Sequence, residues 1–270
     1  MAPLLSAILI ATDEEKDLPG CLESLQGLAE EIIVVVSAET GDRTEGIARA
    51  AGAQVIRRKF DDYASQRQAS LDAATGEWCF WIDPDERVDP PLREAIRDRL
   101  AAPDAQAYEI GFEVRFLGRP LHWGGMGSER HVRLFQRKKG RFVGGLLHEG
   151  LEIDGSISPL LVGKMIHTPY KDLSDYLGKL DRYTSLAARK RWDQGQRFHL
   201  AHHLILPWEF FARAVLKLGV LDGQPGLIWA ALAAFHSWLK YVKLGRIAES
   251  SRDSRAHSVP HEDKRGVKEG

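Results

Sequence analysis

Three carboxylates around a proline form the part of the chain best equipped for chemistry. The cluster reads Asp83-Pro84-Asp85-Glu86 and follows the apolar run at residues 78–82, which is typical of a strand buried on both faces. Pro84 fixes its own backbone angle and lacks an N–H donor, so the strand should end there and present Asp83 and Asp85 on a stiff turn. Carboxylates on such a turn suit Mg²⁺ or Mn²⁺, which keep coordination positions for substrate phosphates. A solvated turn that only caps the next helix is the alternative.

Three further apolar runs precede this cluster. They cover residues 4–10, 32–36 and 55–56, and segments with helical spacing separate them. Strands that alternate with helices predict an α/β fold with a mostly parallel, doubly wound sheet. Ligands bind such sheets beyond the carboxyl ends of the strands, and Asp13, Ser37 and Asp83 all fall there.

The pattern changes beyond about residue 101. Residues 108–116 and 131–135 alternate apolar and polar side chains, which predicts a small antiparallel extension of the sheet. From Asp172 onward the spacing is helical, and tryptophan and phenylalanine accompany lysine and arginine. The apolar run at residues 226–235 is shorter than the roughly 20 residues needed to span a bilayer. We therefore expect amphipathic helices at a membrane surface, with packing onto the sheet as the alternative.

The composition and the first residues bear on the partners of the protein and on its cellular compartment. Lys and Arg total 37 against 38 Asp and Glu, so no nucleic-acid partner is expected. Cys21 and Cys79 stand among apolar neighbours, where buried thiols are commoner than bridges, which fits a reducing cytoplasm. The first residues carry neither a basic leader nor a cleavage site, so no signal peptide is expected and the chain should stay inside the cell.

The chain resembles the family 2 glycosyltransferases of the GT-A (Rossmann-like) fold. More narrowly, it is similar to the bacterial lipopolysaccharide-core glycosyltransferases that add a hexose, typically glucose, to inner-core sugars. The resemblance reaches to about Arg246, and the order and spacing of its motifs are more specific than any one of them. The motifs are Asp13-Glu14-Glu15-Lys16, Glu31-Ile32-Ile33-Val34-Val35, Asp42-Arg43-Thr44, Gln66-Arg67, Ala74-Thr75-Gly76-Glu77-Trp78, Asp83-Pro84-Asp85-Glu86-Arg87-Val88, Gly124-Gly125, Arg133-Leu134-Phe135, Leu147-His148-Glu149, His167 and Leu221-Asp222-Gly223.

The resemblance implies an inverting transfer from a nucleoside-diphosphate sugar that depends on Mg²⁺ or Mn²⁺. It makes Asp85 the direct metal ligand and assigns Asp83 to donor binding. His167 is similar to the late histidine that GT-A enzymes use on the metal or the diphosphate, with a structural histidine as the alternative. Glu149 stands where the family places its catalytic acid, here the general base, with an ion pair within its loop as the alternative.

The resemblance also assigns further residues to the donor site, although each arginine among them could instead be a solvated surface residue. These residues are Asp13, Glu14, Ser37, Glu39, Arg43 and Arg67. Three positions depart from the family, which usually has Asn at Asp13 and Gln68 and Asp at Ser37. The acid lost at Ser37 normally accepts a hydrogen bond from uracil, so a UDP-sugar is favoured but the nucleobase stays open. Glu39 or Asp13 could supply the missing acceptor.

We therefore expect residues 1–170 to form the catalytic domain, residues 171–248 a helical, membrane-associated region, and residues 249–270 a disordered tail. The expected function is transfer of a hexose to a lipid-linked saccharide at the inner face of the cytoplasmic membrane. Trp123, Arg130 and Arg133 lie in the segment where the acceptor should enter, with a core tryptophan next to surface charges as the alternative. The alternatives are a polyprenyl-phosphate or exopolysaccharide acceptor, and a non-catalytic nucleotide-sugar binder.

Overall fold

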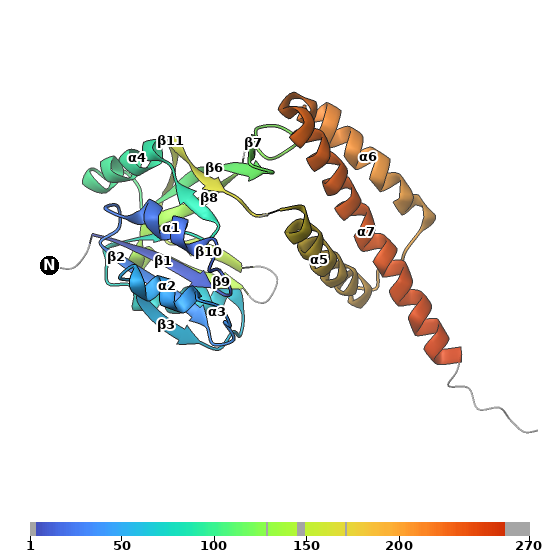
Figure 1. Ribbon diagram of the computed structural model, residues 1–270, viewed down its shortest axis with the longest axis horizontal. Coiled ribbons are helices and arrows are strands. Elements are labelled where there is room, and N and C mark those ends of the chain that lie inside the picture. The colour runs from blue at the N-terminus through green and yellow to red at the C-terminus, as the bar shows by residue number, and fades with distance from the viewer. Residues whose placement is uncertain (1–3, 128, 145–148, 171, 257–270) are drawn as a thin grey trace, which may run out of the picture. The chain divides into compact units, whose positions relative to one another are not determined.

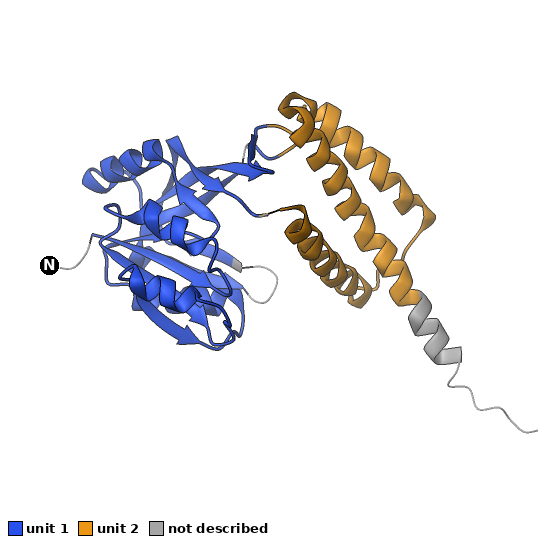
Figure 2. Ribbon diagram, viewed as in Figure 1, with its two compact units in different colours: residues 1–122, 126–169 blue, residues 123–125, 170–270 orange. Residues whose placement is uncertain are grey.

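The computed structural model describes residues 4–127, 129–144, 149–170 and 172–256. It divides into two compact units, shown in different colours in Figure 2. Unit 1 comprises residues 1–122 and 126–169, and unit 2 comprises residues 123–125 and 170–270. The short segment 123–125 therefore belongs to the second unit, although both of its flanks belong to the first.

The first half of unit 1 alternates strands with helices (Figure 1). β2 and β4 both pair in parallel with β1, and β3 pairs in parallel with β2. Side chains of β1 and β2 are buried almost throughout, which explains their continuous apolar sequences and confirms the predicted parallel α/β region. The elements are β1 (Leu5–Ala11), α1 (Leu18–Leu25), β2 (Glu31–Ser37), α2 (Thr44–Ala50), β3 (Gln54–Arg58), α3 (Tyr63–Ala73) and β4 (Trp78–Trp81).

The second half extends the same sheet with antiparallel pairs. Within the described residues nine strands form one sheet in the order β3-β2-β1-β4-β8-β6-β11-β5, with β7 beside β6. β8 runs antiparallel to both β4 and β6, as predicted, whereas β11 runs parallel to β6. These elements are β5 (Glu86–Val88), α4 (Pro90–Ala101), β6 (Ala107–Phe116), β7 (Arg119–Leu121), β8 (Arg130–Gln136) and β11 (Ile157–His167), and a separate hairpin contains β9 (Gly140–Gly144) and β10 (Glu149–Ile153).

A polar cluster fastens the amino end of the sheet. The Glu31 carboxylate accepts hydrogen bonds from the Ser6 hydroxyl and from both the backbone N–H and the hydroxyl of Thr75, the last two at 2.9 Å. Ser6 Oγ in turn accepts the N–H of Gly76 at 2.9 Å, and a Cβ at Gly76 would collide with that hydroxyl. Burial opposes ionisation of Glu31, but these hydrogen bonds outweigh it and lower its pKa. The Thr75-Gly76 motif therefore has a structural role at this end of the sheet.

Unit 2 is helical. Its central helix α7 (Gly223–Ala256) packs against both α5 (Leu173–Asp193) and α6 (Ile205–Phe211), as Figure 2 shows. α7 continues past residue 249, where the sequence predicted disorder to begin, and the rest of that predicted tail lies outside the described residues. No helix of the described chain is long and apolar enough to cross a membrane.

The segment 123–125 is held by hydrogen bonds within unit 2. The Trp123 N–H donates to Asp222 Oδ2 and the Gly124 N–H to the Lys217 carbonyl, both at 2.8 Å, and Arg213 Nη1 donates to the Gly124 carbonyl at 3.2 Å. Gly124 has a φ of 69°, a left-handed conformation that glycine adopts without strain. The Gly124-Gly125 and Asp222 motifs thus have a structural role, and the backbone of Trp123 is bound to Asp222.

Candidate active site

A closed turn follows β4 at the carboxyl edge of the parallel strands. The Glu86 N–H donates to the Asp83 carbonyl at 3.0 Å, and the Asp83 N–H donates back to Glu86 Oε2 at 2.9 Å. β4 ends at Trp81 and β5 begins at Glu86, so the strand stops at the proline turn as the sequence predicted. The turn fixes the direction in which its carboxylates point.

Two arginines meet the Asp83 carboxylate. Arg67 Nη1 from α3 lies 2.7 Å from Asp83 Oδ1, while Arg133 Nη2 from β8 lies 3.4 Å from Asp83 Oδ2 and 2.6 Å from Glu86 Oε1. Both guanidinium groups also stack on the Trp81 ring, at 4.3 Å for Arg67 and 4.1 Å for Arg133. Trp81 therefore contacts two buried cations that share one carboxylate.

The charges in this cluster shift each other's protonation. Burial disfavours ionisation of Asp83, but Arg67 and Arg133 more than compensate and hold its pKa well below the usual range. Burial raises the pKa of Glu86 to about 7, against the pull of Arg133. Nε and Nη1 of Arg133 are buried and have no hydrogen-bond partner among the described residues. Buried donors of this kind fit a ligand that carries acceptor oxygens, as a diphosphate does.

Asp85 and His167 form a second pair beside the cluster. His167 Nε2, at the end of β11, lies 3.3 Å from Asp85 Oδ2, and each side chain is about a quarter exposed. Burial would lower the pKa of His167, but Asp85 raises it above its ordinary value. No group of three or more His, Cys, Asp or Glu side chains among the described residues could hold a metal. Two converging ligand atoms that solvent can reach nevertheless fit Mg²⁺ or Mn²⁺, because these ions complete their shell with water and substrate oxygens.

The loops that follow β1 and β2 are joined to each other. Asp13 has a φ of 55°, and its Oδ1 accepts the Gly41 N–H at 2.9 Å. Asparagine and aspartate tolerate this left-handed conformation better than other side chains, so Asp13 can adopt it at little cost. The Glu14 N–H donates to Thr44 Oγ1 at 2.7 Å. Asp13 and Glu14 therefore help to shape this edge of the sheet.

The other predicted donor residues occupy different environments. Ser37 is buried at the end of β2, and its hydroxyl accepts the N–H of Glu39 at 3.2 Å. Glu39 itself is exposed. Arg43 is 84% exposed and forms an ion pair with Glu15 at 3.2 Å. Of the predicted donor residues, the structure joins Arg67 and Asp83 by a direct ion pair, whereas Ser37 ends β2 and Glu39 and Arg43 lie on the loop that follows it.

The predicted base stands at the start of a hairpin strand. The backbone of Glu149 pairs with Gly144 across β9 and β10, and its side chain and residues 145–148 lie outside the described residues. Phe142 of β9 packs edge-on against Trp81, with ring centroids 5.1 Å apart. The hairpin that carries Glu149 thus packs against the tryptophan that both arginines contact.

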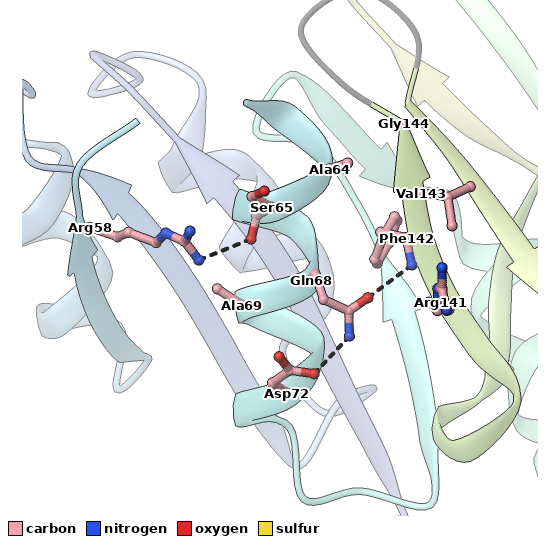
Figure 3. A pocket seen from close by; sticks show the side chains of 10 residues that line it. All are labelled: Arg58, Ala64, Ser65, Gln68, Ala69, Asp72, Arg141, Phe142, Val143 and Gly144. Atoms are coloured by element: carbon pink, nitrogen blue, oxygen red, sulfur yellow. Dashed lines mark hydrogen bonds between the residues drawn. The ribbon is translucent and has the colours of Figure 1, made fainter. Parts of the chain in front are cut away.

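A pocket of about 400 Å³ lies between α3 and β9 (Figure 3). Gln68, where the family usually has Asn, crosses it: its Oε1 accepts the Phe142 N–H at 2.9 Å and its Nε2 donates to Asp72 Oδ1 at 2.7 Å. The dashed lines in Figure 3 mark both hydrogen bonds. Gln68 therefore ties the hairpin to α3, and neither Asp85 nor His167 lines this pocket.

Sequence reasoning missed the roles of Trp81, Glu86 and the buried face of Arg133. The sequence predicts only an apolar strand position for Trp81 and a place near the entrance for the acceptor for Arg133. The available signal was a charged residue inside the apolar stretch of β8, because a buried arginine needs an anionic partner. Cys21 and Cys79 are buried and unpaired, as expected.

The chain is similar to known glycosyltransferases. Residues 6–150 match the family described as Glycosyl transferase family 2. The lipopolysaccharide core biosynthesis glycosyltransferase LpsC of Rhizobium meliloti is 29% identical over 248 residues, which cover 89% of this chain and 91% of LpsC. The glycosyltransferase RT0209 of Rickettsia typhi is 24% identical over 263 residues, which cover 92% and 89% of the two chains. Among solved structures, S. aureus TarS 1–349 in complex with UDP is similar at a TM-score of 0.47 and 15% identity, covering 96% of this chain and 94% of that one.

The family match contains the alternating strands and helices, the Asp83–Glu86 turn and Arg133. It ends before His167 and before the helices of unit 2. The sheet is the mixed α/β arrangement expected of a GT-A enzyme. Because the match spans more than half of the sequence, the chain belongs to glycosyl transferase family 2 and is a glycosyltransferase.

Proposed function

We propose that this glycosyltransferase is an inverting, metal-dependent enzyme that moves a hexose, of the glucose type, from a nucleoside-diphosphate sugar to a lipid-linked saccharide. The observation that carries the proposal is the convergence of Asp85 and His167 beside the arginine-bound Asp83. A UDP-sugar is the favoured donor. The saccharide of the lipopolysaccharide core is the favoured acceptor, supported by the similarity to LpsC along most of both chains.

Asp85 and His167 would hold the Mg²⁺ or Mn²⁺ ion. The ion would offset the negative charge that builds on the diphosphate as the sugar leaves. Arg133 would donate from its buried and unpartnered nitrogens to the same group, since guanidinium suits phosphate oxygens. Asp83 would keep Arg67 and Arg133 in place, and a contact from Asp83 to the donor ribose would share its carboxylate with both arginines.

Glu149 would act as the general base. An inverting transfer needs a group that takes the proton from the acceptor hydroxyl while that oxygen attacks the anomeric carbon from the face opposite the diphosphate. The hairpin places the backbone of Glu149 next to Gly144, and Phe142 packs the hairpin against Trp81. That anchorage would fix the base relative to the donor.

The loops after β1 and β2 would bind the nucleoside. Asp13 and Glu14 lie on the first loop and Glu39 and Arg43 on the second, which Ser37 precedes as the last residue of β2. The exposed Glu39 is the candidate acceptor for a hydrogen bond from the base, because the Ser37 hydroxyl already accepts the Glu39 N–H.

We assign residues 1–170 to catalysis and residues 171–248 to attachment at the inner face of the cytoplasmic membrane. The lipid-linked acceptor would be met there.

A thermal-shift panel with labelled transfer assays tests the proposal. Nucleoside-diphosphate sugars should raise the melting temperature, and Mn²⁺ should increase that rise for the true donor, because ligands stabilise the state they bind. Transfer of label to a purified lipopolysaccharide-core acceptor is the expected result. Transfer only to a polyprenyl phosphate or an exopolysaccharide intermediate would reassign the acceptor, and donor binding without turnover would overturn the catalytic proposal.

A further inference from the structure

Unit 2 carries a row of exposed apolar side chains along one run of helix. The run comprises the 3₁₀ turn η2 (Leu200–Leu204), α6 and the π-helical turn η3 (Ala212–Leu216). Its exposed side chains recur three or four residues apart, which places them along one side of a helix. They are between 45% and 81% exposed, and we call them the α6 stripe: Leu200, Leu204, Trp208, Phe211 and Val215.

The less exposed side of this run is mixed, with half-buried Ile205 and Leu206 as well as polar groups that contact α7. His202 stacks on Tyr241 of α7 with ring centroids 4.1 Å apart, and His203 Nδ1 accepts a hydrogen bond from Trp238 Nε1 at 3.0 Å. Ala214 supplies a buried contact in η3. A surface helix in water turns its large apolar side chains inward, and the five exposed side chains of the stripe depart from that distribution. We therefore expect the α6 stripe to contact an apolar partner outside the unit.

The apolar surface continues beyond the stripe. Four apolar residues at the end of η3 and just after it are each at least 43% exposed: Leu216, Leu218, Val220 and Leu221. Single exposed apolar residues are ordinary on protein surfaces, but a contiguous series of this kind marks an interaction site.

The charges around the stripe identify its partner. Between residues 189 and 217 the sequence has six lysines and arginines but only two acidic residues, Asp193 and Glu209. Both acids form ion pairs with arginines, Asp193 with Arg189 at 3.4 Å and Glu209 with Arg213 at 3.2 Å. Lys217 is exposed at the end of the run. An excess of positive charge in the same segment as exposed apolar and tryptophan side chains suits the boundary between anionic headgroups and acyl chains.

We propose that the α6 stripe inserts into the interface of an anionic lipid bilayer, with the helical run parallel to the membrane plane. The inference refines the membrane attachment of the proposed function by naming the residues that enter the lipid. The other exposed apolar residues of unit 2 then lie outside the inserted segment or at its edge. The bilayer is entered by side chains and not crossed by a helix.

Vesicle flotation of the full chain tests this inference with a matched pair of variants. The stripe variant is Leu204→Glu with Trp208→Glu, whose parent side chains are 68% and 61% exposed. The control is Leu161→Glu with Val162→Glu in β11 of unit 1, where the exposures are 78% and 60%. Both pairs add two acids at exposed apolar positions, so charge and exposure are balanced between them.

We expect the parent to float with vesicles of phosphatidylcholine and phosphatidylglycerol more than with phosphatidylcholine alone. Partitioning should fall roughly tenfold or more in the stripe variant and should change little in the control. Salt should weaken binding of the parent to the anionic vesicles. Brominated lipids should quench the tryptophan fluorescence of the parent more than that of Trp208→Phe.

Equal flotation of parent and stripe variant would overturn the inference. So would a parent dimer that the stripe variant dissociates while vesicle binding persists, because a second copy of the chain would then cover the stripe. Transfer to a water-soluble acceptor fragment separates this result from the proposed function. The stripe variant should keep that activity, and a parent that binds vesicles without any transfer would contradict the function and leave the membrane inference standing.

Discussion

The two units differ in which side chains they bury and which they expose. Unit 1 buries Arg67, Arg133 and Glu86 beside Trp81, although buried charges give little net stability and are costly when a partner is missing. Unit 2 leaves Leu204, Trp208 and other apolar residues in contact with solvent. Departures from ordinary burial concentrate at functional sites. The comparison supports the two proposals, an anionic ligand for unit 1 and an apolar partner for unit 2.

The largest expected effect comes from Asp85 in unit 1. Asp85→Ala should lower kcat/KM about 10³-fold, because a metal ligand supports several kcal/mol of charge stabilisation in the transition state. Steady-state transfer with saturating Mn²⁺ measures it. Asp154→Ala, an exposed residue that pairs with Lys139, is the control and should be nearly neutral. An Asp85 variant as active as the parent would remove the metal from the proposal.

Glu149→Gln should reduce kcat by about 10²- to 10⁴-fold, the usual contribution of a general base. The amide keeps the size of the side chain but cannot accept the proton, so the affinity for the donor should stay close to that of the parent. Turnover and the donor-induced melting shift are measured on the same preparation. Retained turnover would exclude Glu149 as the base.

Arg133→Met tests whether the buried charges of unit 1 depend on one another. The change leaves Glu86 without its 2.6 Å partner and should lower the free energy of unfolding by about 3–5 kcal/mol, as expected when one member of a buried pair is removed. The matched control is Arg43→Met, whose exposed ion pair should be worth less than about 1 kcal/mol. Urea denaturation gives both values, and equal losses would argue against a buried charge cluster.

Glu86→Gln should flatten the pH dependence of stability. Burial raises the pKa of Glu86 to about 7 in the folded chain, whereas an unfolded glutamate titrates at about 4.3. Between these values the folded chain holds a proton that the unfolded chain releases, so the stability of the parent should fall as pH rises through the window. The slope from this group is at most about 1.4 kcal/mol per pH unit. Urea unfolding between about pH 5 and 7 measures it, and identical slopes in parent and variant would contradict the assignment.

The smallest expected effect comes from unit 2 in water. Trp208→Glu should change the free energy of unfolding by no more than about 0.5 kcal/mol, because a side chain that is already exposed contributes little to folding. Thermal unfolding without lipid measures it. A loss of several kcal/mol would show that Trp208 is buried in solution, and the contrast between the two units would fail there.

The amino-acid sequence was sufficient for the parallel part of the fold. β1, β2 and β4 are continuous apolar runs, and Pro84 sets the point at which β4 gives way to the acidic turn. Local patterns of this kind depend only on neighbours in the chain, so they can be predicted from the sequence alone. β5 and β7 escaped prediction because strands of three residues show too little alternation to be recognised.

The sequence alone determined the family resemblance, the α/β class and the candidate roles of Asp85, His167 and Glu149. Tertiary structure decided that Asp83 pairs with both Arg67 and Arg133, that both arginines lie over the Trp81 ring, and that Gln68 ties α3 to the hairpin. It also decided which side of the α6 run faces solvent. These facts join residues distant in the chain, and burial, electrostatic pairing and exposure arise only when folding brings such residues together.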